Sequence, residues 1–349
     1  MRNRDAFRGC LIGGAAGDAL GYAVEFSSKG SIFGKYGPHG ITEYELDRGT
    51  ARISDDTQMT LFTAAGLLLG KARGGEGQYA KAINAAYIDW LETQEGFWPA
   101  EGAVSCPALM AVPGLYSRRA PGGTCMQALR AGGRGTPELP INNSKGCGGV
   151  MRVAPIGLYF NDAGCDARSV ARLGAEAAAL THGHPLGWMP AAVLAQIIHE
   201  ASQDGTSLTE ATAHALRTVE EMWPDTEHMR YFTQLIERAV ELADGDMDDL
   251  AAIETLGEGW VGEEALAIAV FCALRYEDDI DRALIASVNH SGDSDSTGAV
   301  TGNILGAVVG YSGMPRKYTE NLELRELLLE TADALYEDRP IRIEALREG

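Results

Sequence analysis

Glycine recurs every fourth residue in two apolar segments near opposite ends of the chain, and this spacing restricts the folds available to it. The glycines in question are Gly13, Gly17, Gly21, Gly298, Gly302, Gly306 and Gly310. Residues four apart lie on one face of an α-helix, where a second backbone can approach closely if no side chain intervenes. Glycine costs about 1 kcal/mol against alanine inside a helix. The repeated cost predicts two tightly packed central helices; loops are the alternative, but the intervening Ala, Val, Leu and Ile favour helices.

Helical periodicity also dominates elsewhere, and strand patterns are weak. Apolar side chains recur at helical spacing in residues 57–69, and residues 166–180 and 185–200 read as further helices. Ser207 and Glu210 stand three residues apart, which is the pattern of a capping box at a helix start. We therefore predict an all-α fold.

Residues 96–149 are rich in glycine and proline and predict a long irregular segment. Segments of that length inside a folded protein are often functional. The composition shows no linker and no shift that would divide the chain. We therefore predict one domain that spans residues 1–349.

Charge and cysteine content restrict the partners and the compartment. A net charge of −20 argues against nucleic acid and against an anionic membrane surface as partners. The six cysteines form no C-x-x-C pair, and their spacing suits reduced thiols better than zinc ligands or disulfides. No run of about 20 apolar residues is present, so a membrane span is not expected. The expectation is a soluble, cytoplasmic protein.

Two short segments concentrate carboxylates and hydroxyls at predicted helix starts. They are Ser54-Asp55-Asp56-Thr57 and the sequence GDSDST, residues 292–297. Helix capping explains one Asp or Ser in each segment. Two neighbouring carboxylates repel each other unless a cation or a proton intervenes. Oxygen ligands without His or Cys suit Mg²⁺, Mn²⁺ or Ca²⁺ rather than zinc, so the segments predict a hard-cation site wherever they meet.

The chemistry of such a site is metal-assisted hydrolysis. Two cations would bind vicinal hydroxyls or phosphates and activate a water, while a remaining carboxylate acts as general base or acid. Competing motifs are absent from the sequence: it has no G-x-S-x-G, no GxxxxGK[ST], and no GxGxxG after a predicted strand.

Six blocks of the chain resemble the ADP-ribosylglycohydrolases, a family that includes the dinitrogenase-reductase-activating glycohydrolase and the ADP-ribosylarginine hydrolases. The blocks follow the family's order and extend over nearly the whole chain. They are GCLIGGAAGDALGYAVEF (9–26), RISDDTQMTLFTAAGLL (52–68), NNSKGCGGVMRVAPIGL (142–158), LTHGHPLGW (180–188), LGEGWVGEEALAIAVFCAL (256–274) and NHSGDSDSTGAVTGNILGAVVG (289–310).

The resemblance implies a compact orthogonal bundle of helices around a central binuclear metal site. It implies two Mg²⁺, with Mn²⁺ as the alternative, held by Ser54, Asp55, Asp56, Asp293, Asp295 and Ser296. Many relatives have Thr in place of the two serines, and serine keeps the hydroxyl. In relatives the metals hold the ribose distal to adenine, and a metal-bound water and a nearby Asp act at its anomeric carbon. The residues that the resemblance makes catalytic candidates are Asp55, Asp56, Asp293 and Glu25.

Glu25 lies in the loop after GDALG, where some relatives place a mobile carboxylate over the metals. Asp18 is expected to orient a helix end or to contact a metal ligand. The segment from Asn143 to Gly149 resembles the family's phosphate and ribose cradle, in which backbone N–H groups receive a pyrophosphate. An ordinary glycine turn is the alternative.

Within that segment the candidate substrate residues are Asn143, Gly146, Gly148 and Gly149. Arg152 would pair with a phosphate or with a surface carboxylate. His182 follows the family's Thr-His pattern near the substrate, and Trp260 would border the adenine site or pack in the core.

The resemblance favours a magnesium-dependent hydrolase that removes ADP-ribose from modified protein side chains and releases ADP-ribose. GDSDST and GCGGVMR look closer to the arginine-directed relatives, while serine and O-acetyl linkages stay open as alternatives. A second class of function is an immunity protein that binds an ADP-ribosylating toxin. Such relatives use an N-terminal extension, whereas the first family block here starts at Gly9.

Overall fold

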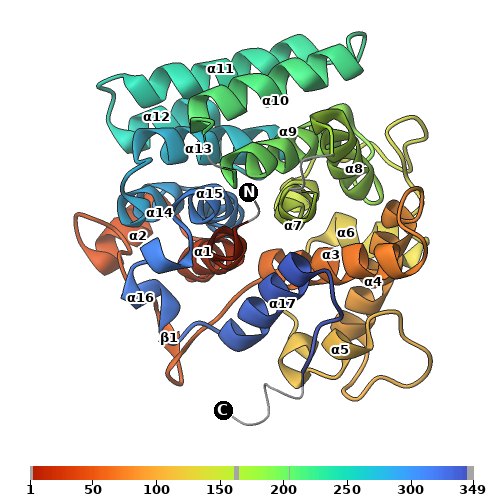
Figure 1. Cartoon of the computed structure of the whole chain (residues 1–349). Helices are drawn as coiled ribbons and strands as arrows, with labels where there is room; N and C mark the ends of the chain where they lie inside the picture. Colours follow the sequence, from red (N-terminus) through yellow and green to blue (C-terminus); the bar gives the residue numbers. More distant parts are fainter. Residues whose placement is uncertain (1–2, 161–164, 204, 344–349) are drawn as a thin grey trace.

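The computed structural model describes residues 3–160, 165–203 and 205–343, and α-helices dominate them. This confirms the predicted all-α fold (Figure 1). The α-helices and strands are α1 (Arg4–Tyr22), α2 (Lys29–Tyr36), β1 (Leu46–Asp47), β2 (Thr50–Ala51), α3 (Asp55–Ala72), α4 (Tyr79–Glu95), α5 (Pro107–Met110), α6 (Gly123–Arg130), α7 (Ala154–Tyr159), α8 (Ala167–Ala179), α9 (Pro185–Ala201), α10 (Leu208–Met222), α11 (Met229–Asp244), α12 (Asp249–Leu256), α13 (Gly262–Arg275), α14 (Ile280–Val288), α15 (Ser294–Val309), α16 (Arg316–Thr319) and α17 (Arg325–Glu337). Short 3₁₀ turns add η1 (Pro113–Tyr116), η2 (Cys147–Gly149) and η3 (Tyr311–Gly313).

The two strands form a minimal antiparallel hairpin in which Leu46 pairs with Ala51 and Asp47 pairs with Thr50. The glycine- and proline-rich stretch 96–149 is only partly irregular, because it contains α5, α6 and the turns η1 and η2. The Ser207–Glu210 capping box forms as predicted and starts α10. In the described part of the chain, no helix combines the length and the apolar character that crossing a bilayer requires. One domain over residues 1–349 stays a prediction.

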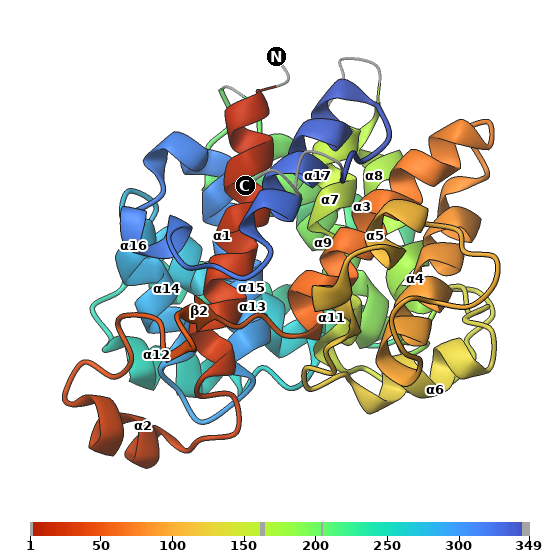
Figure 2. The same ribbon diagram turned by 90° about the horizontal axis from the view of Figure 1, so that it is seen from below.

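The glycine-spaced helices α1 and α15 pack against each other with their backbones in close approach, as the spacing predicts. A Cβ added at Gly302 would lie 1.9 Å from the carbonyl oxygen of Gly13, and one at Gly13 would lie 2.2 Å from that of Gly302. Gly17 and Gly298 face each other in the same way. The pair runs antiparallel through the interior, seen end-on in Figure 1 and along α1 in Figure 2.

This close packing brings the end of α1 to the start of α15, because Gly21 lies against the backbone of Ser294. Near the end of α1, the buried Asp18 carboxylate accepts hydrogen bonds from the backbone N–H of Ser54 at 2.9 Å and of Thr57 at 3.1 Å. Asp18 thus orients the start of α3, which is one of the two roles expected for it. The starts of α3 and α15 are therefore held near the same end of α1.

The turn η2 is fixed to the segment that precedes α13. Gly262 N–H donates to the carbonyl of Lys145 at 2.8 Å, and Cys147 N–H donates to that of Trp260 at 3.3 Å. Gly149 is the last residue of η2, and a Cβ there would lie 2.5 Å from the carbonyl oxygen of Gly187 at the start of α9. These contacts join the glycine-rich segment to the starts of α13 and α9.

Candidate metal centre and substrate cleft

Both acidic segments begin helices, and their side chains take part in capping. Ser54 is the N-cap of α3, and its Oγ accepts from Asp56 N–H at 3.2 Å. Asp293 is the N-cap of α15, and its Oδ1 accepts from Ser296 N–H at 3.3 Å. Asp18 also accepts from Thr57 N–H in the first turn of α3, and Asp295 Oδ1 also accepts from Ser296 N–H at 2.9 Å. The other carboxylates stand in the first turns, where the positive end of the helix dipole favours negative charge.

The two helix starts meet in a cleft of about 320 Å³. Ten of the residues predicted for the site line this cleft. They are Glu25, Asp55, Asp56, Gly146, Gly148, His182, Trp260, Asp293, Asp295 and Ser296. Ser54 is fully buried behind the lining, where its hydroxyl lies 3.3 Å from Asp56 Oδ2.

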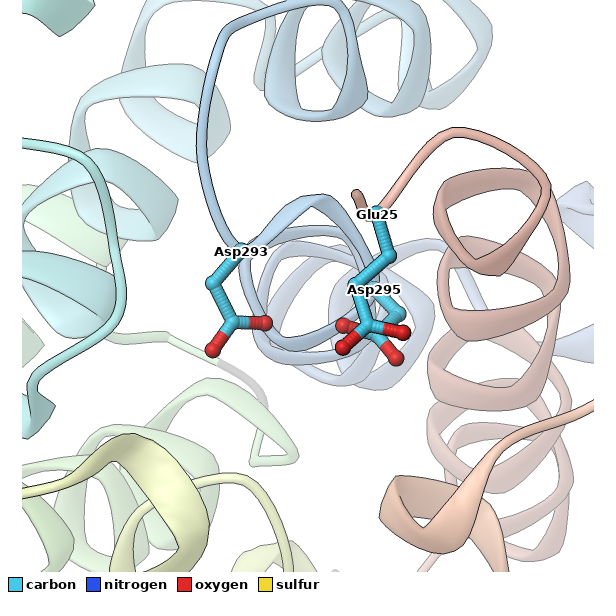
Figure 3. A group of neighbouring side chains, drawn as sticks. All are labelled: Glu25, Asp293 and Asp295. Carbon is cyan, nitrogen blue, oxygen red and sulfur yellow. The ribbon is translucent and has the colours of Figure 1, made fainter. Parts of the chain in front are cut away.

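Three of these carboxylates form a tight cluster, shown in Figure 3. Glu25, Asp293 and Asp295 each offer one oxygen atom, and these atoms lie within 4.8 Å of one another. Glu25 comes from the turn after α1, and the two aspartates come from the start of α15. Asp55 lies on another wall, where its Oδ2 accepts from Gly122 N–H at 3.1 Å.

The carboxylates are buried together, and their ionisation is disfavoured. Burial, reinforced by the charge of Asp295, raises the pKa of Asp55, Asp56 and Asp293 well above its usual range. The same causes raise the pKa of Glu25 to about 10. Without cations, such a group retains protons that carboxylic acids normally lose near pH 4.

Two carboxylate oxygens in the cleft are left without a hydrogen-bond partner. Asp56 Oδ1 and Glu25 Oε2 are buried, and no donor reaches them among the described residues. A buried acceptor with no partner costs free energy unless a proton or cation completes it. The donor set of carboxylate and hydroxyl oxygens fits a hard divalent cation. The residues present therefore suit the hard-cation site that the sequence predicts.

Gly146 and Gly148 line one wall of the cleft, and the lack of a side chain there leaves room for the His182 ring. A Cβ at Gly148 would lie 3.0 Å from His182 Cε1 and 2.8 Å from Cys125 Sγ. His182 Nδ1 lies 2.8 Å from Thr181 Oγ1. Burial, followed by the nearby positive charge of Arg152, lowers the pKa of His182 to about 3. The imidazole is therefore neutral at physiological pH and has one hydrogen-bond donor and one acceptor.

Three predicted substrate residues do not line the cleft. Asn143 is exposed, and Gly149 is the buried last residue of η2. Arg152 is fully buried, so the surface-carboxylate alternative fails. Its Nη2 donates to Thr181 Oγ1 at 2.6 Å, and its guanidinium lies 4.3 Å from the ring centre of Tyr87. These contacts give Arg152 an interior position behind the wall that carries His182.

Several further residues line the cleft that the sequence patterns did not predict. Phe26 stacks on Trp260 at the cleft, with ring centres 6.0 Å apart and an interplanar angle of 19°. Both rings are solvent-accessible, at 76% and 39%. The α6 start contributes Gly122, Gly123 and Thr124. Phe26 follows Glu25 directly, but sequence spacing does not show that Trp260 lies against it.

Cys147 is a further residue that the sequence did not indicate. It lines the cleft, and its Sγ donates to Asp293 Oδ2 at 2.8 Å. In the sequence, the glycines of this segment suggested a role in substrate binding. The spacing of Cys147 from the other cysteines suggested none. Among the described residues that line the cleft, none is Lys or Arg. A phosphate in this cleft would therefore depend on cations, backbone N–H groups and neutral donors.

Comparison with known proteins identifies the family to which the chain belongs. The model of the ADP-ribosylglycohydrolase family matches residues 1–343. The chain belongs to the ADP-ribosylglycohydrolase family. This membership agrees with the six sequence blocks and supports ADP-ribosyl hydrolase activity.

The relatives are distant but extend along most of the chain. ADP-ribosylhydrolase ARH3 of Mus musculus is 26% identical and covers 92% of this chain and 88% of its own length. ADP-ribosylhydrolase ARH1 of Dictyostelium discoideum is 24% identical, over 93% of this chain and 92% of its own length. The ADP-ribosyl-[dinitrogen reductase] glycohydrolase of Rhodospirillum rubrum is 25% identical, over 92% and 91% respectively.

A solved structure described as an "ADP-ribosylglycohydrolase-related protein complex" has the same fold. It superposes with a TM-score of 0.63 at 25% identity, and covers 97% of this chain and 99% of its own. This similarity agrees with the compact, all-α architecture expected from the sequence.

Proposed function

We propose that the chain hydrolyses the N-glycosidic bond of ADP-ribosylarginine in modified proteins, with two Mg²⁺ as cofactors and Mn²⁺ as a substitute. The observation that carries the proposal is the meeting of five carboxylates from three chain segments in one cleft. Two of them retain unpartnered oxygens. Such a set is costly to bury without cations and well suited to hold them.

The cations would be held by the two helix starts, through Ser54, Asp55, Asp56, Asp293, Asp295 and Ser296. When bound, they supply positive charge that holds the vicinal hydroxyls of a ribose and lowers the pKa of a water. The carboxylates of Asp55, Asp56 and Asp293 would accept the proton of the attacking water and orient it. Glu25, in the turn over the cluster, would complete the site as a fourth acid–base group.

The reaction forms a bond from water oxygen to the anomeric carbon and breaks the bond from that carbon to the arginine nitrogen. The water proton passes to a carboxylate, and the leaving guanidine takes up a proton. The products are free ADP-ribose and unmodified arginine.

The remaining walls suit the rest of the nucleotide. Backbone groups at Gly146 and Gly148 and the neutral imidazole of His182 provide donors where a basic side chain is absent from the described lining. Trp260 with Phe26 offers an aromatic surface for adenine. We assign Arg152 a supporting position behind His182, Gly149 a packing position, and Asn143 a place on the adjoining surface.

The choice of arginine linkage rests on the sequence of the GDSDST and GCGGVMR segments. Serine-linked and O-acetyl-linked ADP-ribose are the alternatives. The experiment is a competition in which all three substrates are present at equal concentration and release of ADP-ribose is measured for each. Preferential cleavage of the serine linkage would overturn the arginine assignment while leaving the hydrolase intact.

Metal dependence is tested in the same assay. We expect activity to vanish with EDTA and to return with Mg²⁺ or Mn²⁺, and Zn²⁺ to restore it poorly because the ligands are oxygen atoms. Full activity after dialysis against excess EDTA would exclude the metal mechanism. An absence of any release with every metal would instead favour a binding protein such as a toxin antagonist. The relatives named above are hydrolases, which favours the enzyme.

We place this activity in the cytoplasm, because the spacing of the six cysteines suits reduced thiols better than disulfides or zinc ligands. The partner is an ADP-ribosylated protein.

A further inference from the structure

Arg152 is a fully buried cation, and in the described part of the chain no carboxylate forms an ion pair with it. Its Nη2 donates to Thr181 Oγ1 at 2.6 Å and to Ala177 O at 3.1 Å, and its Nη1 lies 3.4 Å from Cys125 Sγ. Burying a charge without an opposite charge is costly. The short contact with a neutral hydroxyl is therefore the feature of Arg152 that calls for a function beyond packing.

The hydroxyl of Thr181 has a single hydrogen atom to donate. Arg152 carries no acceptor, so it is the donor in its contact with Thr181. The Thr181 hydrogen can go to His182 Nδ1 at 2.8 Å or to Ala178 O at 3.4 Å. Ala178 O already accepts from the backbone N–H groups of Thr181 at 3.1 Å and His182 at 3.0 Å. Thr181 also interacts with Cys125, whose sulfur is a weak acceptor. His182 Nδ1 is therefore the favoured acceptor.

The other ring nitrogen of His182 is accessible from the cleft. His182 lines the cleft, and its Nε2 has no hydrogen-bond partner among the described residues. A Cβ at Gly146 would lie 3.3 Å from Nε2, so the glycine leaves this atom accessible. Because the pKa of His182 is lowered to about 3, chiefly by burial, the neutral ring carries one proton. If Nδ1 accepts from Thr181, that proton must be on Nε2.

We propose that Arg152 and Thr181 are positioning residues that hold His182 in its Nε2–H form, so that the ring presents a donor to the cleft. Donation from Arg152 polarises the Thr181 hydroxyl and strengthens its own donation to Nδ1. An Nε2–H group suits the oxygens of a pyrophosphate, whereas an unprotonated Nε2 would repel them. The inference rests on the proposed function for the identity of the ligand, but the position of the proton does not depend on it.

Nitrogen NMR of the whole chain, labelled with ¹⁵N in its histidines, determines where the proton lies. An unprotonated ring nitrogen resonates far downfield of a protonated one, and the His182 signals are those lost in His182→Gln. We expect the wild-type protein to show an unprotonated Nδ1 and a protonated Nε2. A predominantly protonated Nδ1 would overturn the inference, and this observation requires no variant of Thr181 or Arg152.

Thr181→Val removes the hydroxyl and keeps the shape of the side chain. We expect the Nδ1 signal to move to the position of a nitrogen that is protonated or lacks a hydrogen bond, and Thr181→Ser to restore the wild-type position. Thr212→Val is the matched control, because Thr212 is buried in α10, donates to Leu208 O at 2.9 Å and lies outside the cleft lining. A wild-type Nδ1 signal in folded Thr181→Val would refute the role of Thr181.

Arg152→Met removes the donor to Thr181 Oγ1, which can then accept from an Nδ1–H group. We expect the share of the Nδ1-protonated form to increase in this variant. Thermal unfolding shows whether each variant is folded. Unchanged proportions of the two forms in folded Arg152→Met would refute the role of Arg152.

Affinity for ADP-ribose, measured by calorimetry with Mg²⁺, connects the proton to the ligand. We expect Thr181→Val to weaken binding by about 5- to 10-fold, as for the loss of one hydrogen bond. Turnover should change less than about 3-fold, because a contact with the pyrophosphate is the same in the ground state and the transition state. Wild-type affinity in folded Thr181→Val would show that the donor does not serve the ligand. If even the wild-type protein fails to bind ADP-ribose, the proposed function is wrong, and the NMR spectra still decide the position of the proton.

Discussion

Asp293 serves two purposes, since it caps α15 and belongs to the carboxylate cluster. Changing Asp293 to Asn preserves capping, because Asn caps helices as well as Asp does, but removes a negative charge from the proposed cation site. We expect turnover with Mg²⁺ to fall on the order of 10²-fold or more, as when one electrostatic contact to a transition state is lost. Stability in EDTA should not fall, because repulsion within the cluster is relieved.

Asp248→Asn is the matched control for this prediction. Asp248 caps α12 through a 3.3 Å hydrogen bond to Ala251 N–H and lies outside the cleft lining. The same chemical change there should leave turnover unchanged. Steady-state kinetics on the two variants and thermal unfolding in EDTA make the comparison. Near-wild-type turnover in the Asp293 variant would contradict its assignment as a metal ligand.

Glu25 should make the stability of the metal-free protein depend on pH. Its pKa rises from 4.5 to about 10 in the folded state, chiefly through burial and then through Asp295. Between these two values the folded state binds more protons than the unfolded state, so the free energy of unfolding falls as pH rises. Glu25 therefore favours the fold most below pH 4.5, and this contribution is lost progressively toward pH 10.

The measurement is thermal unfolding in EDTA from pH 5 to pH 9, for wild type and for Glu25→Gln. The variant carries a permanently neutral side chain, so its melting temperature should fall less steeply across this range. Glu237→Gln, a change at an exposed position on α11, controls for the loss of a surface charge. Equal slopes for wild type and Glu25→Gln would show that Glu25 does not titrate as inferred.

At the scale of elements, helices α1 and α15 depend on having no side chain between them. In Gly302→Ala the new Cβ would lie 1.9 Å from the backbone oxygen of Gly13, so the helices must separate. We expect a loss of about 2 kcal/mol or more in the free energy of unfolding, since overpacking outweighs the gain in helix propensity. Activity should also fall, because the start of α15 carries cluster residues.

Gly34→Ala in α2 supplies the control, because nothing lies within 4 Å of a Cβ at that position. Its stability should rise by up to about 1 kcal/mol, as expected for alanine in an open helical site. Denaturant unfolding of both variants measures the difference. Similar stability of the two variants would mean that the helices adjust to a methyl group without cost.

These two helices also show what sequence patterns could predict. The four-residue glycine spacing requires no knowledge of the partner, because each helix carries its own half of the interface. The acidic helix starts were predictable for the same local reason. The stack of Phe26 on Trp260 and the contact of Cys147 with Asp293 join segments far apart in the chain. No periodicity within either segment encodes those pairs.

Arg152 shows a further limit of sequence patterns. An arginine beside a glycine-rich cradle predicts contact with phosphate or a surface carboxylate, and the structure buries it fully instead. Its Nη2 donates to Ala177 O at 3.1 Å and to Thr181 Oγ1 at 2.6 Å, and its guanidinium lies over the Tyr87 ring. Each partner comes from a helix or turn distant in sequence. Only the packed fold determines that this cation faces inward.

At the scale of the whole molecule, the chain is strongly negative, and the described lining of the cleft contains no basic side chain that would offset its carboxylates. The net charge is −20, and the described lining contains five carboxylates and neither Lys nor Arg. A pyrophosphate would be repelled by this surface if no cations were present. Magnesium should therefore promote nucleotide binding as well as catalysis. The cleft predicts that affinity for the product ADP-ribose depends on the metal.

We expect ADP-ribose with Mg²⁺ to stabilise the protein more than any smaller ligand does. The cations would take the distal ribose hydroxyls, backbone groups at Gly146 and Gly148 the pyrophosphate, and the aromatic surface the adenine. At about 100 times its dissociation constant, a ligand adds roughly 2.7 kcal/mol to the free energy of unfolding. For a chain of 349 residues, an unfolding entropy of about 2.1 cal/mol/K per residue converts this to a melting shift of about 4 °C.

The comparison uses ADP-ribose, AMP and ribose-5-phosphate, each with Mg²⁺ and with EDTA. Removing the cations deletes the ribose contacts and the charge compensation but leaves the backbone donors and the aromatic wall. A weak shift with ADP-ribose should therefore remain in EDTA. AMP lacks the distal ribose, so its shift should respond less to magnesium than that of ADP-ribose. If AMP matches ADP-ribose under both conditions, the cations do not hold the distal ribose, and the reacting carbon lies elsewhere in the cleft.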